Sequence, residues 1–237
     1  MVNPAKVFRI TEDADLGFIA QKLKDFREEE TYETEDEETK ELVTEVLDLE
    51  LEEDKLTGVF SRDFVRSRYY RRGLVETLVT EEAPFWVREF RGQNFLVVLA
   101  PSVARGVKKL LTNHVANKLS EVIFLKSGLI VEAKIAHETL KELHESNPRA
   151  TKLIWFDNID FPDVGKLCLS GSALADTKLY HEYLDHGKIW YAVFEAEKYG
   201  FVVGVTRNCV ITLFSKATVD EFSDYILKEI IPLVEQE

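Results

Sequence analysis

The sequence is poor in residues that cross-link or interrupt a chain, with two cysteines, one methionine and six prolines among 237 residues. Cys168 and Cys209 each lie in an apolar run, and two cysteines without a CxxC pair do not make a zinc site. We therefore expect two buried, reduced thiols. No apolar run reaches the roughly 18 residues of a membrane span, and the N-terminus lacks the apolar segment of a signal peptide. These absences predict a cytoplasmic protein without a membrane contact.

Recognised catalytic motifs are also missing. The chain has no Walker loop, no GxGxxG and no nucleophile elbow. His181 and His186 are five residues apart, whereas two zinc ligands on one helix face need a spacing of four. Asp157, Asp160 and Asp163 fit a strand end and a turn, with a metal-dependent nuclease as the weaker alternative. We expect no catalytic residues, no cofactor and no bound metal.

The residues that are present suit a globular protein, since 45% are hydrophobic and 31% are charged. Glutamate and lysine are abundant while methionine, glutamine and cysteine are scarce. This usage is typical of heat-adapted proteins, in which ion-pair networks replace thermolabile side chains. This usage indicates that the organism grows at high temperature, and it gives no information on function.

Nearly all of the net negative charge lies in one stretch of thirty residues. From Asp25 to Asp54 there are sixteen acidic and two basic residues, a net charge of −14, against −13 for the whole chain. The part at 27–41 has almost no apolar residue, which predicts a solvated, mobile loop. The functional alternative is an acidic lure that mimics nucleic acid or shields the arginines that follow.

Two segments of the chain share one layout of glycines and predicted elements, which indicates an internal duplication. Gly58 and Gly73 are 15 residues apart, and Gly171 and Gly187 are 16 apart. After each second glycine come three strand-like runs and an amphipathic helix. The alternative is a single α+β domain in which similar pieces match by chance.

The duplication predicts two α+β halves, residues 1–119 and 120–237. Each half is expected to be an antiparallel sheet covered on one face by long amphipathic helices. The expected strands are 7–10, 43–51, 74–80, 85–91, 94–100, 122–125, 153–159, 188–197, 199–206 and 209–215. The expected helices are 13–27, 102–119, 136–146, 172–186 and 218–236, the last beginning with a capping box at Thr218 and Glu221.

A cluster of arginines and tyrosines follows the acidic stretch. Its members are Arg62, Arg66, Arg68, Tyr69, Tyr70, Arg71 and Arg72, with Asp63 as the single acid among them. Analogy with 172–186 predicts a helix over 61–72. A strand is the alternative, and it places Arg62, Arg66, Arg68 and Arg72 on one face with aromatic residues. Guanidinium groups bind phosphate and aromatic rings stack on bases, so this interleaving favours a nucleic-acid contact.

A structural role for the cluster is the alternative: the arginine stems cover the core while their charged ends meet the acidic stretch. The leading hypothesis is a non-enzymatic protein that binds nucleic acid, or a nucleic-acid-bound protein, through this cluster. The second hypothesis is a protein–protein adaptor whose acidic segment engages a basic partner. Arg88, Arg91, Arg105, Lys108 and Lys109 are read as ordinary surface charges.

Overall fold

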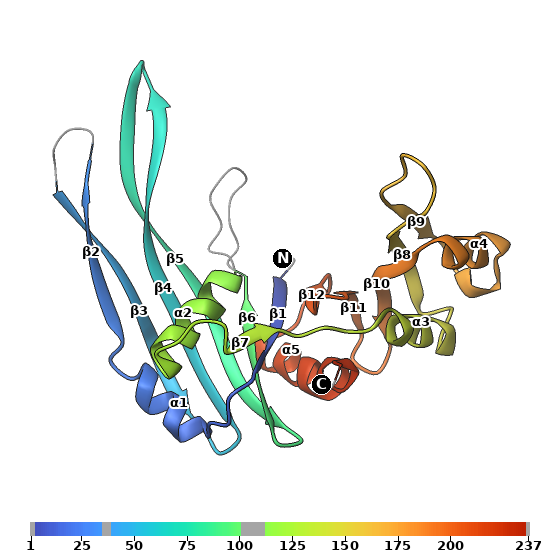
Figure 1. The fold of residues 1–237 in the computed structure, drawn as a ribbon, viewed down its shortest axis with the longest axis horizontal. Helices are drawn as coiled ribbons and strands as arrows, with labels where there is room; N and C mark the ends of the chain where they lie inside the picture. The colour runs from blue at the N-terminus through green and yellow to red at the C-terminus, as the bar shows by residue number, and fades with distance from the viewer. Residues whose placement is uncertain (1–2, 35–38, 101–111, 236–237) are drawn as a thin grey trace. The chain divides into compact units, whose positions relative to one another are not determined.

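A computed structural model of the chain describes residues 3–34, 39–100 and 112–235 (Figure 1). The described strands are Asn3–Ile10 (β1), Arg27–Glu33 (β2), Thr39–Leu51 (β3), Lys55–Tyr70 (β4), Gly73–Phe90 (β5), Gln93–Leu99 (β6), Ile130–Glu132 (β7), Thr151–Asp157 (β8), Leu167–Ser170 (β9), Lys188–Ala196 (β10), Phe201–Thr206 (β11) and Val210–Leu213 (β12). The hydrogen-bonded order is β2-β3-β4-β5-β6-β1-β12-β11-β10-β8-β9, and β7 pairs with β1.

The helices are short. They are Leu16–Leu23 (α1), Thr112–Phe124 (α2), His137–Ser146 (α3), Lys178–His186 (α4) and Val219–Tyr225 (α5), with 3₁₀ turns at Leu174–Asp176 (η1) and Ile231–Leu233 (η3) and a π turn at Ile226–Ile230 (η2). Among the described residues no helix is both long enough and apolar enough to span a membrane.

The expected fold class is wrong. The described residues form mostly one large antiparallel sheet of twelve strands with five short helices, and not two repeated halves covered by long amphipathic helices. The proposed repeat fails at two matched pairs of elements. Residues 61–70 continue strand β4, whereas their counterpart contains helix α4, and residues 122–124 end helix α2, where the repeat requires a strand.

Contacts divide the chain into two compact units. We call residues 8–131 the hairpin unit, and residues 1–7 together with 132–237 the C-terminal unit. In the C-terminal unit the sequence located the elements well: α3, α4, β8 and β10–β12 lie within a few residues of their expected places. The capping box is present, because Thr218 and Glu221 exchange hydrogen bonds at the start of α5. Cys209 is buried as expected, but Cys168 is exposed.

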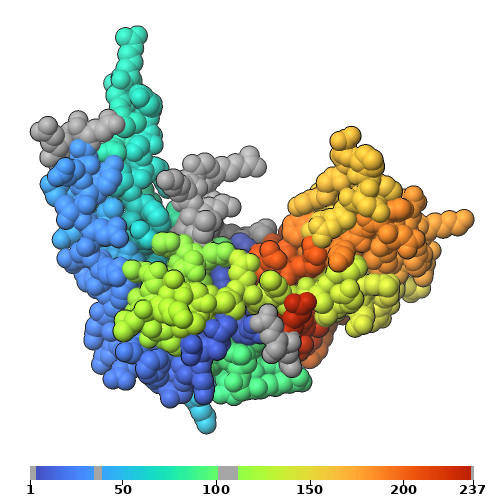
Figure 2. Space-filling model, viewed as in Figure 1, coloured from blue at the N-terminus to red at the C-terminus, as the bar shows by residue number. Residues whose placement is uncertain are grey.

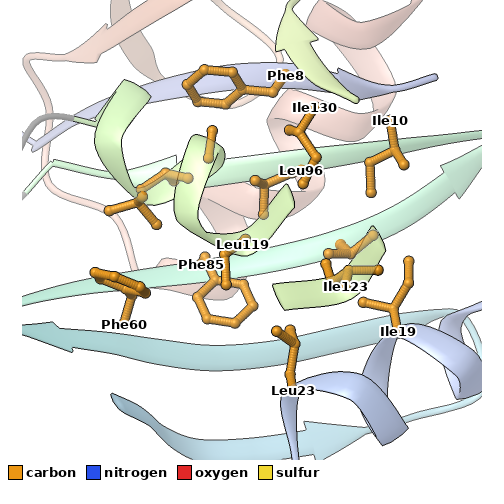
Figure 3. Close-up of a cluster of buried hydrophobic side chains, with 14 of the residues drawn as sticks. Phe8, Ile10, Ile19, Leu23, Phe60, Phe85, Leu96, Leu119, Ile123 and Ile130 are labelled. Atoms are coloured by element: carbon orange, nitrogen blue, oxygen red, sulfur yellow. The ribbon is translucent and has the colours of Figure 1, made fainter. Parts of the chain in front are cut away.

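In the hairpin unit, helices α1 and α2 cover one face of the sheet (Figure 3). Leu119 and Ile123 of α2 and Leu23 of α1 pack with Phe60 and Phe85 of the sheet, and all five are at most 2% exposed. This packing fixes the inner part of β4 and β5 as the core of the unit. The expected helix 102–119 is described only from Thr112 onward, and residues 102–111 lie outside the described ranges.

The acidic segment at 27–41 is not the loop that its composition predicts. Strand β2 pairs with β3 from Arg27↔Glu45 to Glu33↔Thr39, so its described part is a β-hairpin; residues 35–38 lie outside the described ranges. Opposite charges offset part of the repulsion. Lys118 of α2 lies 2.6 Å from the Glu28 carboxylate, and Arg27 contacts Glu29 and Glu45 at 2.8 and 3.0 Å.

Candidate nucleic-acid interface

The Arg/Tyr cluster lies on the longest hairpin of the structure. Strands β4 and β5 pair without interruption from Lys55↔Arg88 to Tyr70↔Gly73, which is sixteen residue pairs. The inner part lies against the core, and the outer part extends beyond the helices of the hairpin unit as a two-stranded ribbon (Figures 1 and 2). We call residues 64–80 the ribbon tip. The expected helix over 61–72 is therefore wrong, and the strand alternative describes the segment through Tyr70.

Alternation along β4 decides which side chains share a face. Leu56, Gly58 and Phe60 are buried against the helices, so the even-numbered residues of β4 belong to that face. Continuing outward, Arg62, Phe64, Arg66, Arg68 and Tyr70 follow on the same face. The ribbon therefore interleaves three guanidinium groups with two aromatic rings on one side, which is the arrangement that the strand alternative requires.

Arg62 is held by the protein itself. Its Nη1 donates a hydrogen bond to Nε2 of His114 on α2, and its Nη2 lies 4.0 Å from the Glu30 carboxylate on β2. The His114 ring in turn meets the edge of Phe60. Of the seven residues predicted for the site, Arg62 thus acts at least partly as a structural residue that ties α2 and β2 to the ribbon.

His114 must be neutral to accept this hydrogen bond. Burial lowers the pKa of His114 below its usual value, and the adjacent positive charges of Arg62 and Lys118 lower it further. At neutral pH the imidazole therefore accepts at Nε2 and carries its proton on Nδ1.

The carboxylate of Asp63, the single acid within the cluster, also forms hydrogen bonds within the protein. Its carboxylate accepts a hydrogen bond from the Val43 backbone N–H at 3.0 Å and from the Thr80 hydroxyl at 2.6 Å. It joins β3, β4 and β5 where the ribbon leaves the sheet. Asp63 is therefore not the partner that would neutralise the arginines beyond it.

The four outer arginines differ from Arg62. Arg66, Arg68, Arg71 and Arg72 form no ion pair with any residue that the structure describes, and Nε of Arg66 is buried without a hydrogen-bond partner there. The guanidinium of Arg71 lies 5.4 Å from the centre of the Tyr70 ring. The side chains of Arg68, Arg71 and Arg72 are exposed. The cations of Arg68, Arg71 and Arg72 are therefore accessible to an external anion, and Arg66 is partly buried.

Exposed rings and apolar side chains accompany these charges. Tyr69 is 82% exposed and Tyr70 57%, and Val75 and Leu78 of β5 are also exposed. Glu76 is the single acid of the ribbon tip, and its carboxylate accepts hydrogen bonds from Ser67 and Tyr32. The ribbon tip therefore carries a net charge of +3 in a chain whose net charge is −13. Such a charge reversal on a projecting element is the electrostatic footprint of a polyanion contact.

The turn at the end of the ribbon is strained. Arg71 and Arg72 both have positive φ angles, 48° and 71°, in a two-residue turn that most often holds Asn-Gly. The neighbouring β5–β6 turn also has two positive φ angles, 53° and 78°, but its residues are Arg91 and Gly92, so only one side chain is strained there. Two adjacent arginines in the left-handed region are unfavourable for folding. Backbone strain of this kind is frequent at functional sites.

Other residues considered from the sequence lie elsewhere. Arg88 pairs with Asp54 at 2.8 Å at the inner end of the hairpin, and Arg105, Lys108 and Lys109 lie outside the described residues. In the C-terminal unit Asp157 forms an ion pair with Arg207, and a carboxylate oxygen of Asp160 lies 2.8 Å from Nδ1 of His186. Within the described ranges no three His, Cys, Asp or Glu residues come together in a way that could hold a metal ion.

Comparison with models of known protein families finds no match, and comparison with curated protein sequences finds none either. Function therefore has to be inferred from the geometry and charge of this chain.

The neutral state of His114 predicts a pH dependence of stability. The folded-state pKa lies below the unfolded value of about 6.5, so the contribution to stability is full above that pH and is lost as the pH falls through the folded pKa. We expect His114→Gln, which keeps an acceptor but does not titrate, to lose less stability than the wild type between pH 7.5 and 5. Urea unfolding at both pH values measures this, and equal losses would contradict it.

The strained turn predicts a gain of stability on substitution. The double change Arg71→Asn and Arg72→Gly should raise the free energy of local opening at the ribbon end by about 1–2 kcal/mol. The reason is that asparagine and glycine adopt the left-handed region at lower cost than arginine. Hydrogen exchange of the amides from Tyr69 to Leu74 measures this free energy. The matched control, Arg71→Lys with Arg72→Lys, keeps both charges and the strain and should exchange like the wild type. Unchanged exchange in the Asn-Gly variant would show that the turn is not strained.

Proposed function

We propose that this protein is a non-enzymatic nucleic-acid-binding protein and that its contact surface is the ribbon tip. The observation that supports this most is the set of four outer arginines, which lack carboxylate partners among the described residues and stand beside two exposed tyrosines. Arginine guanidinium groups form paired hydrogen bonds with phosphate oxygens, and bases of any kind can stack on tyrosine rings. A two-stranded ribbon is also narrow enough to enter a nucleic-acid groove.

The charge distribution supports a polyanion more than a generic protein partner. The hairpin unit holds most of the acidic residues of the chain, so a polyanion is repelled from most of its surface and attracted at the ribbon tip. The protein would therefore bind a nucleic acid in one orientation, with the ribbon tip toward it. Its strength would depend steeply on salt, because phosphate contacts release counterions.

The test measures binding to single-stranded and duplex DNA and RNA over a salt series. Four phosphate contacts predict slopes of log K against log salt of about −3.6 on duplex DNA and about −2.8 on single strands. Replacing Arg66, Arg68, Arg71 and Arg72 together by Ala should remove nearly all binding and flatten the slope.

The matched control replaces four exposed cations elsewhere in the hairpin unit, namely Lys22, Lys24, Arg91 and Lys126, by Ala. This control changes the net charge by the same amount and should bind nearly as well as the wild type. If the wild type binds no nucleic acid more tightly than about 0.1 mM at low salt, or if both variants lose binding equally, the proposal fails.

The acidic hairpin supports a second candidate, an adaptor that captures a basic peptide. Strand β2 ends the strand order, and its exposed residues include Glu29, Glu30 and Glu33, so an extended basic segment could add to this edge. Deleting 28–41 would remove β2 and the start of β3, so the test uses charge removal. Glu29, Glu30 and Glu33 changed together to Gln should abolish capture of a polylysine peptide under this function. Under the leading function the same variant should bind nucleic acid at least as well as the wild type.

A further inference from the structure

The C-terminal unit contains a pocket that is independent of the ribbon. It has a volume of about 230 Å³ and lies between the end of α3, the β10–β11 turn and the helical segment that ends the chain. Its walls are mainly apolar and aromatic, with Leu143, Phe194, Tyr225 and Leu233 among them, and Glu229 and Tyr199 supply polar atoms. This volume exceeds that of a cavity that accepts benzene and lies below the range typical of drug-sized ligands.

The polar edge of the pocket is organised around Glu229. The Tyr199 hydroxyl donates a hydrogen bond to Oε1 of Glu229 at 2.7 Å. Oε2 has no partner among the described residues. The Tyr199 hydrogen bond lowers the pKa of Glu229, and the adjacent Lys198 lowers it further, so the group is an ionised carboxylate. Glu229 lies in the π turn η2, and such turns within helices are frequent at functional sites.

An ammonium group from the chain itself already lies at this edge. Nζ of Lys198 is 3.2 Å from Oε1 of Glu229 and 5.0 Å from the centre of the Tyr199 ring. The carboxylate and the ring face together thus bind a cation through one ion pair and one cation–π contact. The Lys198 side chain is 76% exposed, so it is held weakly and is readily displaced.

We propose that this pocket binds a small organic ammonium compound with an apolar, ring-sized body. The ring would lie against Phe194, Tyr225 and Leu143, and the ammonium would replace Nζ of Lys198 beside Glu229 and the Tyr199 ring. A neutral ligand of the same shape would form no ion pair with Glu229 and would leave Lys198 in place, and an anionic one would be repelled. Glu197 adds negative charge at the same edge, whereas Glu195 is paired with Lys152 at 3.1 Å.

Isothermal titration of the full chain with 2-phenylethylammonium tests the proposal. We expect a dissociation constant of about 1 mM. This value corresponds to a moderate binding free energy per atom for a ligand of about nine non-hydrogen atoms. The neutral 2-phenylethanol and the anionic phenylacetate should bind at least about tenfold more weakly, because they form no ion pair with Glu229. Butylammonium, which mimics a lysine side chain, should also bind about tenfold more weakly, because it lacks the ring.

Two substitutions give opposite results under this proposal. Glu229→Gln should weaken 2-phenylethylammonium binding at least about tenfold, whereas Lys198→Ala should strengthen it up to about fivefold by removing the internal competitor. Asp224→Asn is the matched control, since it removes a carboxylate from α5 that does not line the pocket. It should leave binding unchanged. Thermal unfolding of each variant confirms that it is folded.

Several outcomes would overturn the proposal. Equal affinity for 2-phenylethanol would show a purely apolar pocket, and equal affinity for butylammonium would show a site for a lysine-like side chain. The absence of saturable binding up to 10 mM in both the wild type and Lys198→Ala would show that the pocket takes no such ligand (10 mM being about tenfold above the expected constant).

Discussion

The backbone ladder between β4 and β5 is the constraint on which the candidate interface depends. A two-stranded ribbon is only marginally stable by itself in water, so the outer residue pairs persist because the inner ones are fixed in the core. Phe60 and Phe85 anchor the inner part, and Asp63 and Arg62 fasten the point where the ribbon leaves the sheet. Residues 67–73 at the end of the ribbon are exposed, which leaves the cations of Arg68, Arg71 and Arg72 accessible.

The sequence predicted α3, α4, β8 and β10–β12 of the C-terminal unit because its periodic patterns and its capping residues agree there, whereas the expected helix 218–236 is α5 followed by a π turn and a 3₁₀ turn. It failed in the hairpin unit, where local signals and long-range pairing disagree. Residues 61–70 alternate arginine with aromatic residues, a pattern that fits neither a clean helix nor a half-buried strand, and the comparison with 172–186 favoured the wrong alternative. Glutamates at 28–30 have low strand propensity, yet pairing with β3 and the cation of Lys118 make that segment a strand.

In the candidate sites too, the sequence does not reveal contacts between residues that are distant in the chain. The seven residues of the Arg/Tyr cluster were predicted as a contact surface from composition alone, because charge and aromatic content are visible in a single segment. The partner that sets Arg62 apart, His114, is 52 residues away in the chain. Tyr199 and Glu229 are 30 residues apart and belong to no local motif. Contacts of this kind arise only when strands and helices are assembled, so no sequence pattern indicates them.

The outer ribbon has a further consequence for how this protein can change over time. Residues 66–77 do not belong to the core cluster of the hairpin unit, and their backbone is held by cross-strand pairing that most side chains allow. Substitutions there change the charge and shape of this surface while leaving the core cluster untouched. The chemistry of the tip surface and the packing of the core are thus encoded in separate parts of one pair of strands, and the tip is free to diverge among descendants that share the same scaffold.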